Sequence, residues 1–128
     1  MNSENDGSHR QALGRRGEEI ACKMLVSEGF RLLGRNWRDG KRGELDIIAH
    51  DLREDAVVFV EVKTRTTDAC GRPAEAVTPS KLRRMRTLGR SWLSMYGWRY
   101  SLVRFDVVEV LVAPTGPARV NHIQGVDL

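Results

Sequence analysis

Two apolar runs separated by a short polar turn constrain the fold of this chain more than any other feature. The runs cover residues 45–52 and 56–63, and the turn between them is centred on Arg53 and Glu54. Runs of strand length that lie this close together favour an antiparallel hairpin. The chain is therefore expected to fold around one β-sheet that contains this hairpin.

The two faces of the predicted hairpin differ in character. Pairing about the turn places Asp46 opposite Glu61 and Glu44 opposite Lys63, and alternation puts all four side chains on one face. The other face is apolar and is predicted to be core: Leu45, Ile47, Ala49, Val58, Val60 and Val62. Nearer the turn, the first face is apolar as well: Ile48, Val57 and Phe59. Three carboxylates and one lysine are therefore grouped at the open end of the hairpin.

Two carboxylates that face each other across neighbouring strands repel and destabilise the pair unless a cation lies between them. Converging carboxylate oxygens suit a hard divalent ion, Mg²⁺ or Mn²⁺. Lys63 lies on the same face as Glu61, where it could orient an attacking water or neutralise a scissile phosphate. The alternative is an exposed, solvated face in which Glu44 and Lys63 form an ordinary cross-strand ion pair.

The remaining periodicity predicts an α+β domain with the element order α-β-β-β-α-β-β. Thr78 is expected to cap the second helix, Pro79 to occupy its first position and Gly97 to end it. The other elements are a first helix over residues 11–28 and strands over residues 30–37, 101–112 and 120–123. By composition, residues 1–9 form a disordered tail and residues 10–128 a single domain. Asp106 is expected to be a structural hydrogen-bond acceptor within the sheet.

Basic residues are unevenly distributed, although the net charge is only +4. Between residues 76 and 105 there are seven basic residues and no acidic one. Arg83, Arg86 and Arg90 form a stripe along the second helix that either follows a nucleic-acid backbone or is merely solvated. Arg65 and Lys81 are two further candidates for holding a phosphate. The three tryptophans, Trp37, Trp92 and Trp98, are expected at the core or its edge rather than as platforms for stacked bases.

The hairpin and several short strings elsewhere resemble a known nuclease pattern. Asp46 with Glu61-Val62-Lys63 resembles the PD-(D/E)xK motif of restriction-endonuclease-like nucleases. A wider set of short strings resembles the small bacterial YraN family, usually described as endonucleases akin to Holliday junction resolvases. These strings begin at Gly14, Arg35, Gly43, Phe59, Glu75 and Arg104, and Lys81 belongs to the same set. One departure is Leu45, which stands where the motif has proline.

This resemblance implies a mixed sheet flanked by helices in a restriction-endonuclease-like core. It also implies that Asp46, Glu61 and the backbone carbonyl of Val62 bind the metal and that Lys63 is the catalytic lysine. Glu18 matches an extra acidic ligand of resolvases, although a surface charge on the first helix is the alternative. Glu44 would lie next to the metal ligands and support them without binding the metal itself.

The predicted function is a Mg²⁺- or Mn²⁺-dependent endonuclease that acts on DNA, with branched DNA as the expected substrate. Two alternatives stay open: a non-catalytic nucleic-acid-binding module of a repair complex, and a protein-interaction domain. The chain offers no membrane span and no signal peptide, and two cysteines form no disulfide framework. We therefore expect a cytoplasmic protein without a membrane partner, and by analogy with resolvases a homodimer.

Overall fold

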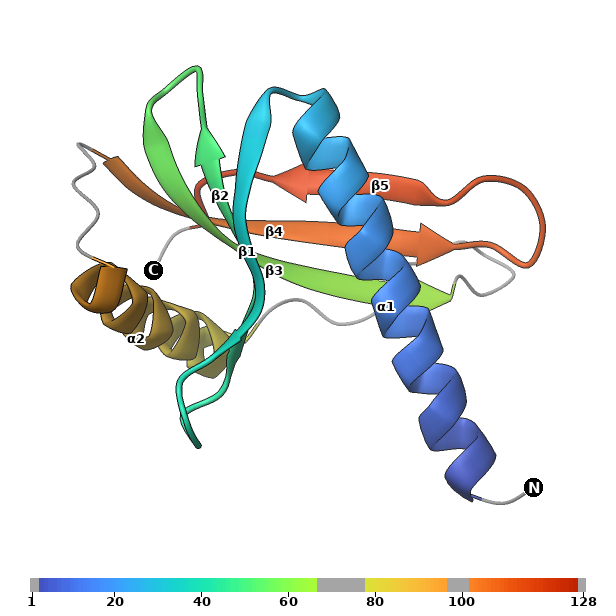
Figure 1. The fold of residues 1–128 in the computed structure, drawn as a ribbon. Coiled ribbons are helices and arrows are strands. Elements are labelled where there is room, and N and C mark those ends of the chain that lie inside the picture. Colours follow the sequence, from blue (N-terminus) through green and yellow to red (C-terminus); the bar gives the residue numbers. More distant parts are fainter. Residues whose placement is uncertain (1–2, 67–77, 97–101, 127–128) are drawn as a thin grey trace.

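The computed structural model describes residues 3–66, 78–96 and 102–126, which form two helices and one five-stranded sheet (Figure 1). The order is α-β-β-β-α-β-β, as predicted, and the architecture is the expected mixed α+β type. The elements are α1 Ser3–Ser27, β1 Phe30–Arg38, β2 Glu44–Asp51, β3 Ala56–Thr66, α2 Pro79–Tyr96, β4 Leu102–Val112 and β5 Arg119–Ile123. The fold is consistent with a restriction-endonuclease-like core.

The sheet is mixed, and its spatial order follows the chain from β1 to β5. β3 and β4 are parallel, whereas the other neighbours are antiparallel. β2 and β3 pair in the predicted register from Asp51–Ala56 to Ile47–Val60. A slip by one residue would exchange the residues that pack with α1 for those that pack with α2, and the short turn at residues 52–55 holds the pairing in place.

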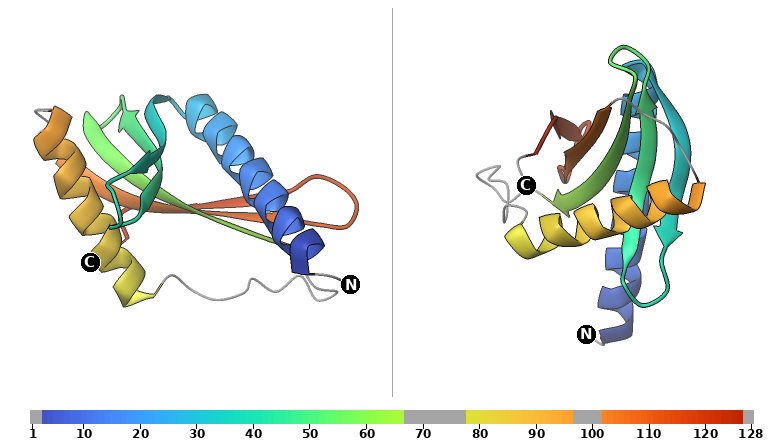
Figure 2. Two further views of the ribbon diagram at one scale, coloured as in Figure 1. Left: turned by 60° about the horizontal axis from the view of Figure 1, so that its bottom comes forward. Right: turned by 90° about the vertical axis from the view of Figure 1, so that its left-hand side faces the viewer.

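The two helices cover opposite faces of the sheet (Figure 2). Val58 and Val60 pack with α1, whereas Val57 and Phe59 pack with α2, so β3 is buried on both faces. α2 approaches β3 closely at Gly89, where an added Cβ would lie 2.9 Å from the ring of Phe59. The hairpin is thus the central layer of the domain, as its two apolar faces predicted.

Leu45 corrects one prediction about the hairpin. It packs in the α2 core, whereas Ile47 packs in the α1 core, so the two-residue alternation is lost between them. Leu45 pairs with Trp37 on β1, and β1 is irregular there because Asn36 adopts φ 51°. Leu45 thus changes face just beyond the position where β2 and β3 cease to pair.

Element boundaries differ from the predictions mainly at the first helix. α1 begins at Ser3, so it includes residues 3–9 that composition had assigned to a disordered tail. α2 agrees closely: Thr78 caps it by accepting a hydrogen bond from the Lys81 amide at 3.3 Å, and Pro79 is its first residue. Gly97, Trp98 and residues 67–77 lie outside the described residues. Within the described residues, neither helix is long and apolar enough to cross a membrane.

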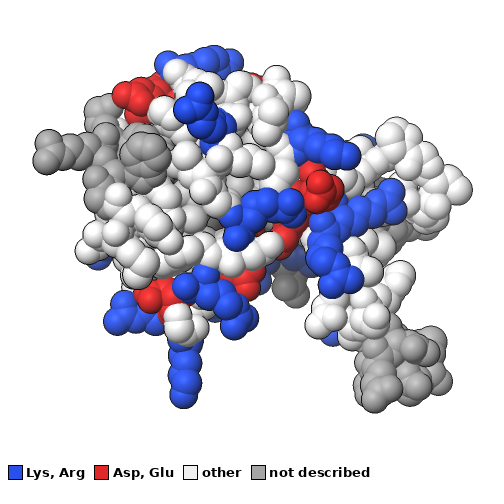
Figure 3. Space-filling view, viewed as in Figure 1, with Lys and Arg blue, Asp and Glu red and all other residues white. Residues whose placement is uncertain are grey.

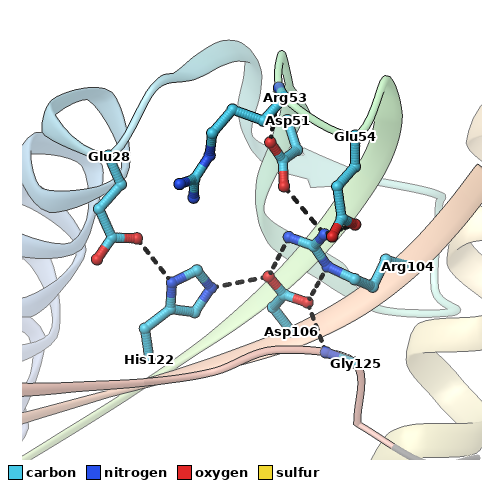
Figure 4. A network of polar contacts seen from close by, with 8 residues as sticks. All are labelled: Glu28, Asp51, Arg53, Glu54, Arg104, Asp106, His122 and Gly125. Carbon is cyan, nitrogen blue, oxygen red and sulfur yellow. Dashed lines mark hydrogen bonds and ion pairs between the residues drawn. The ribbon is translucent and has the colours of Figure 1, made fainter.

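A buried polar network joins the turn end of the hairpin to β4 and β5 (Figure 4). Asp106 is fully buried and accepts hydrogen bonds from Arg104 Nε at 2.9 Å and from the Gly125 amide at 3.0 Å. His122 bridges Asp106 at 2.7 Å and Glu28 at 3.0 Å. Asp106 is therefore the structural acceptor that its position between apolar residues predicted.

Candidate active site

Asp46 lies where β2 separates from β3. The last pair of that ladder is Ile47–Val60, and one residue further Asp46 Oδ2 accepts a hydrogen bond from the Val62 amide at 2.8 Å. The side chain of Asp46 thereby reaches across to the backbone that follows Glu61. This contact holds Asp46 and Glu61 as neighbours on adjacent strands, which is the arrangement predicted from the hairpin.

The residues of β3 that follow Val60 point alternately to the two faces of the sheet. Val62 is half-buried against the α1 core. Glu61 interacts with the charges of Lys63, Lys81 and Arg84. Lys63 therefore accompanies Glu61, as alternation required, and the first turns of α2 bring further cations toward the same carboxylate.

α1 supplies the third carboxylate. Glu18 lines a pocket of about 380 Å³ together with Asp46, Glu61 and Thr64, and Arg10 contributes to its rim. The side chain of Glu18 is only 17% exposed and lies 4.0 Å from Arg35. Figure 3 shows acidic and basic side chains beside one another on the face of the molecule that carries α1. Glu18 is thus placed with the two hairpin carboxylates rather than on a fully solvated helix surface.

Burial and mutual repulsion dominate the electrostatics of the three carboxylates. Burial, together with the charge of Glu61, raises the pKa of Asp46 to about 7. The pKa of Glu18 is also raised, mainly by burial and then by Asp46. Burial raises the pKa of Glu61 although the nearby cations oppose this. The pKa of Lys63 is lowered, first by burial and then by the ammonium of Lys81. The pocket therefore favours occupancy by a positive ion.

Glu44 does not pair with Lys63 in the way the register suggested. Its carboxylate instead accepts from Arg38 Nε at 3.1 Å. With its amide nitrogen turned toward the carboxylates, Asn36 donates to Glu44 at 2.7 Å and to Glu18 at 3.1 Å. The ladder between β2 and β3 ends before it reaches Glu44, so this residue lies beside β1 rather than opposite Lys63. Asn36 belongs to the string that begins at Arg35 but was assigned no role from the sequence; asparagine tolerates its left-handed backbone better than most residues.

The oxygen ligands of this pocket suit a hard divalent ion. Within the described residues, no three histidine, cysteine, aspartate or glutamate side chains form a group able to hold a metal by themselves. Mg²⁺ in enzymes is commonly held by one or two carboxylates, with waters and substrate phosphates completing its shell. Asp46 and Glu61, two neighbouring carboxylates that repel each other, match this description.

The basic residues of α2 divide into two groups. Lys81 and Arg84 act on Glu61, and the Arg84 side chain passes over Gly43 at the end of the β1–β2 loop. Arg83 and Arg90 are exposed, on the side of the helix away from its buried stripe. Arg84 was not predicted from the sequence as a site residue, although its spacing of three residues from Lys81 could have indicated that the two lie on one side of the helix. Arg65 is half-buried on β3, two residues beyond Lys63.

Gly17 sets the position of Glu18. A Cβ at Gly17 would overlap Thr64, lying 2.6 Å from the Thr64 Cβ, so rotation of the Thr64 side chain cannot relieve the clash. We expect Gly17→Ala to push α1 away from β3 and to lower the free energy of unfolding by roughly 1–3 kcal/mol. Urea denaturation measures this change.

Gly14→Ala is the matched control, because an added Cβ there meets nothing within 4 Å. It should raise stability by up to about 1 kcal/mol through helix propensity alone. Equal effects of the two substitutions would contradict a close contact between α1 and β3 at Gly17.

Comparison with known proteins places this arrangement in a family. The model of the uncharacterised protein family UPF0102 matches residues 17–110, a span that contains Glu18, Asp46, Glu61 and Lys63. A UPF0102 protein of Mycobacterium sp. (strain KMS) is 50% identical over 117 residues, covering 91% of this chain and 86% of that protein. The UPF0102 protein of Mycolicibacterium gilvum (strain PYR-GCK) is 49% identical, covering 91% and 94%. That of Mycobacterium tuberculosis (strain ATCC 25177 / H37Ra) is 48% identical over 120 residues, covering 91% and 93%.

The match confirms the small uncharacterised family that the sequence resembles, and the family description names no activity. Both the family model and the relatives extend over most of the chain. The chain therefore belongs to the uncharacterised protein family UPF0102.

Proposed function

We propose that this protein is a divalent-metal-dependent endonuclease that hydrolyses phosphodiester bonds in DNA. The observation that carries the proposal is the pocket in which Asp46, Glu61 and Glu18 meet, with Lys63, Lys81 and Arg84 acting on Glu61. Carboxylates alone would repel a phosphate, and cations alone would only bind one. Their combination at the end of a hairpin suits metal-assisted attack on a bound phosphodiester.

Each residue has a defined task in this proposal. Asp46 and Glu61 would hold Mg²⁺ or Mn²⁺ together with the Val62 carbonyl, and Glu18 would add negative charge to the same pocket. The ion, when bound, supplies a Lewis acid and lowers the pKa of a coordinated water. Lys63 orients the attacking water and offsets negative charge on the phosphate, and Glu44, with Asn36, keeps Glu18 in place. Lys81, Arg84 and Arg65 hold the phosphates that flank the scissile bond.

A nucleic-acid-binding module without catalysis is the second candidate. It is favoured by Arg83 and Arg90, which are exposed on α2, and by a groove of about 500 Å³ that Arg42 and Arg90 line beside this helix. This candidate explains the cations but gives the buried carboxylates no role. A protein-interaction domain would explain neither group.

The proposed substrate is branched DNA, and two copies of the chain would allow cuts in two strands. The free thiol of Cys22 is buried and is in keeping with a reducing, cytoplasmic setting. Neither the branched substrate nor the dimer is needed for the chemistry of a single pocket.

The test is cleavage of four-way junction, flap, duplex and single-stranded DNA at one fixed salt concentration. We expect nicking or cutting with Mg²⁺ or Mn²⁺ and none with EDTA. Binding should be measured in parallel by fluorescence anisotropy. Binding without cleavage under all metal conditions would support the binding module and contradict the endonuclease.

The two groups of α2 cations should act differently on DNA. Changing Arg83, Arg86 and Arg90 to alanine should weaken DNA binding and reduce the salt slope by up to about 0.9 for each phosphate that is no longer neutralised. Changing Lys81 and Arg84 to glutamine should lower the cleavage rate of bound DNA more strongly. Anisotropy titrations over a salt series and single-turnover cleavage separate these effects.

The matched control removes three exposed cations that lie outside α2: Lys23 of α1, Arg31 of β1 and Arg53 of the hairpin turn. This triple variant has the same net charge as the α2 triple and should change affinity and slope much less. If the two triple variants behave alike, α2 does not lie on the DNA backbone.

A further inference from the structure

An aromatic pocket lies beside α2 at the β1 edge of the sheet. Its walls include Trp37 of β1 and Trp92 and Tyr96 of α2, and its floor includes Gly34 and Ile48. The cavity measures about 460 Å³, within the range of small-molecule sites. The rings of Trp92 and Tyr96 lie 5.1 Å apart and 37° from parallel. We call this cavity the aromatic pocket.

Gly34 lines the aromatic pocket without contributing a side chain to it. A Cβ added at Gly34 would point toward Ile48, whose Cδ1 would be the nearest atom at 3.6 Å. Tyr96 is 55% exposed, so part of its ring is not used by the core. Trp37 and Trp92 lie at the core and its edge, as predicted, yet each also contributes to this cavity. The rings of Trp37 and Tyr96 are partly exposed, whereas Trp92 is buried, and flat rings of this kind suit a planar apolar ligand.

The aromatic pocket lies on α2 and β1, two elements that also contribute residues beside the candidate active site. α2 extends along the sheet from Lys81 and Arg84 to Trp92 and Tyr96 (Figure 2), and Arg84 and Trp92 are about 12 Å apart at 1.5 Å per residue. On the other side, Trp37 pairs with Leu45, the residue before Asp46. A strand of DNA bound at the active site would therefore reach the pocket within a few nucleotides.

The surroundings of the pocket carry the charge that a nucleotide requires. Arg35 is among its lining residues, and the side chain of Arg38, next to Trp37 in the chain, is 73% exposed. Arg42 and Arg90 line the neighbouring groove on α2. Stacking on aromatic side chains with cations beside them is the general mode of binding for unpaired bases.

We propose that the aromatic pocket stacks an unpaired nucleobase of the DNA substrate. This inference rests on the proposed endonuclease function and specifies its substrate class: DNA with unpaired bases close to the scissile phosphate. A fully paired base would first have to leave its stack, which opposes binding of continuous duplex in the pocket.

The test compares substrates that differ only in the unpaired bases. Affinity is measured by anisotropy for a flap DNA, for the same flap with abasic nucleotides, and for continuous duplex, all in EDTA at fixed salt. The abasic flap keeps every phosphate, so any difference reports the base alone. We expect the parent protein to bind the flap about tenfold more tightly than its abasic counterpart.

Two variants remove the pocket in different ways. Gly34→Leu fills it without a strained backbone, and Tyr96→Ala removes a ring at the last residue of α2. Both should lose the preference for the flap over the abasic flap while keeping the affinity for duplex. Leu52→Ala, an exposed apolar residue in the hairpin turn, is the control and should keep the preference. Tyr96→Phe should also keep it, because the ring remains.

Three outcomes would overturn the inference. Equal affinity of the parent for the two flaps, with cleavage intact, would reject the pocket but not the endonuclease. A dimer that Gly34→Leu dissociates in size-exclusion chromatography would show that a second copy occupies the pocket. Absence of binding to every DNA tested would reject the proposed function, and this inference with it.

Discussion

Asp46→Asn is expected to lower the rate of metal-dependent DNA cleavage by about three orders of magnitude while the protein stays folded. Asparagine keeps an oxygen that can accept the hydrogen bond from the Val62 amide, but it removes the negative charge that would hold the ion. Loss of a metal ligand removes several kcal/mol of transition-state stabilisation. Glu61→Gln should behave in the same way. Single-turnover cleavage and calorimetric titration with Mn²⁺ measure the two effects.

The stability of these variants separates a metal site from a structural network. In EDTA, the carboxylates of Asp46, Glu61 and Glu18 repel one another in a partly buried pocket. Removing one charge should therefore leave the urea midpoint unchanged or raise it, and metal-free DNA binding should hold or strengthen. A variant that unfolds would show that the carboxylates stabilise the fold, which contradicts the proposed role.

Lys63→Met and Glu44→Gln complete the comparison. Lys63→Met should lower turnover with little loss of Mn²⁺ affinity, because the lysine acts on the water and the phosphate rather than on the ion. Glu44→Gln should have a smaller effect, since Glu44 contacts Arg38 and Asn36. Equal trace cleavage by the parent and all variants would identify a contaminating nuclease.

Arg104→Leu is expected to lower the free energy of unfolding by about 3–5 kcal/mol. The guanidinium contacts Asp106 at 2.9 Å, Asp51 at 3.0 Å and Glu54 at 2.7 Å, and both aspartates are almost completely buried. Leucine would leave two buried carboxylates without their principal counter-charge. Arg104→Lys should cost less, although a lysine cannot reproduce the paired contacts of the planar group. Urea denaturation at pH 7 gives both values.

The pH dependence of stability tests the same network. Burial alone would lower the pKa of His122, but its hydrogen bonds to Asp106 and Glu28 outweigh burial and raise it. A raised pKa means that stability is fully present below the unfolded value of about 6.5 and declines as pH rises through the folded value. Burial would raise the pKa of Asp106, yet contacts with His122 and Arg104 lower it, so this contribution is lost only in acid.

His122→Gln should therefore flatten the alkaline decline and leave the acid decline in place. Urea midpoints measured between pH 3 and pH 9 show both the acid decline and the alkaline decline in stability. An unchanged alkaline limb in the variant would mean that His122 is not protonated in the native network. DNA binding at neutral pH should change little in either network variant, because the network lies at the opposite end of the hairpin from Asp46.

The sequence alone determined the elements and the register of the central hairpin. Residues 45–52 and 56–63 are apolar runs separated by one short turn, and the length of that turn sets which residues of β2 and β3 pair. Thr78 and Pro79 likewise predicted the start of α2, because capping depends on neighbours within one helical turn. Local rules of this kind can be read without knowing what packs on the sheet.

Contacts between distant residues were decided by the tertiary structure. The hairpin predicted that Asp46 and Glu61 would be neighbours, but the position of Glu18 depends on the close approach of α1 to β3 at Gly17. The end of the β2–β3 ladder at Ile47 left Glu44 with Arg38 instead of Lys63, and Leu45 lies on the α2 face.

The same limit applies to surfaces that two elements share. Arg84 and the aromatic pocket depend on the angle at which α2 crosses β1 and β2, and side-chain packing along the whole helix sets that angle. Sequence spacing determines which residues share a face of one element. Only the packed sheet and helices determine which faces meet, because that choice minimises exposed apolar area and steric overlap over the whole domain.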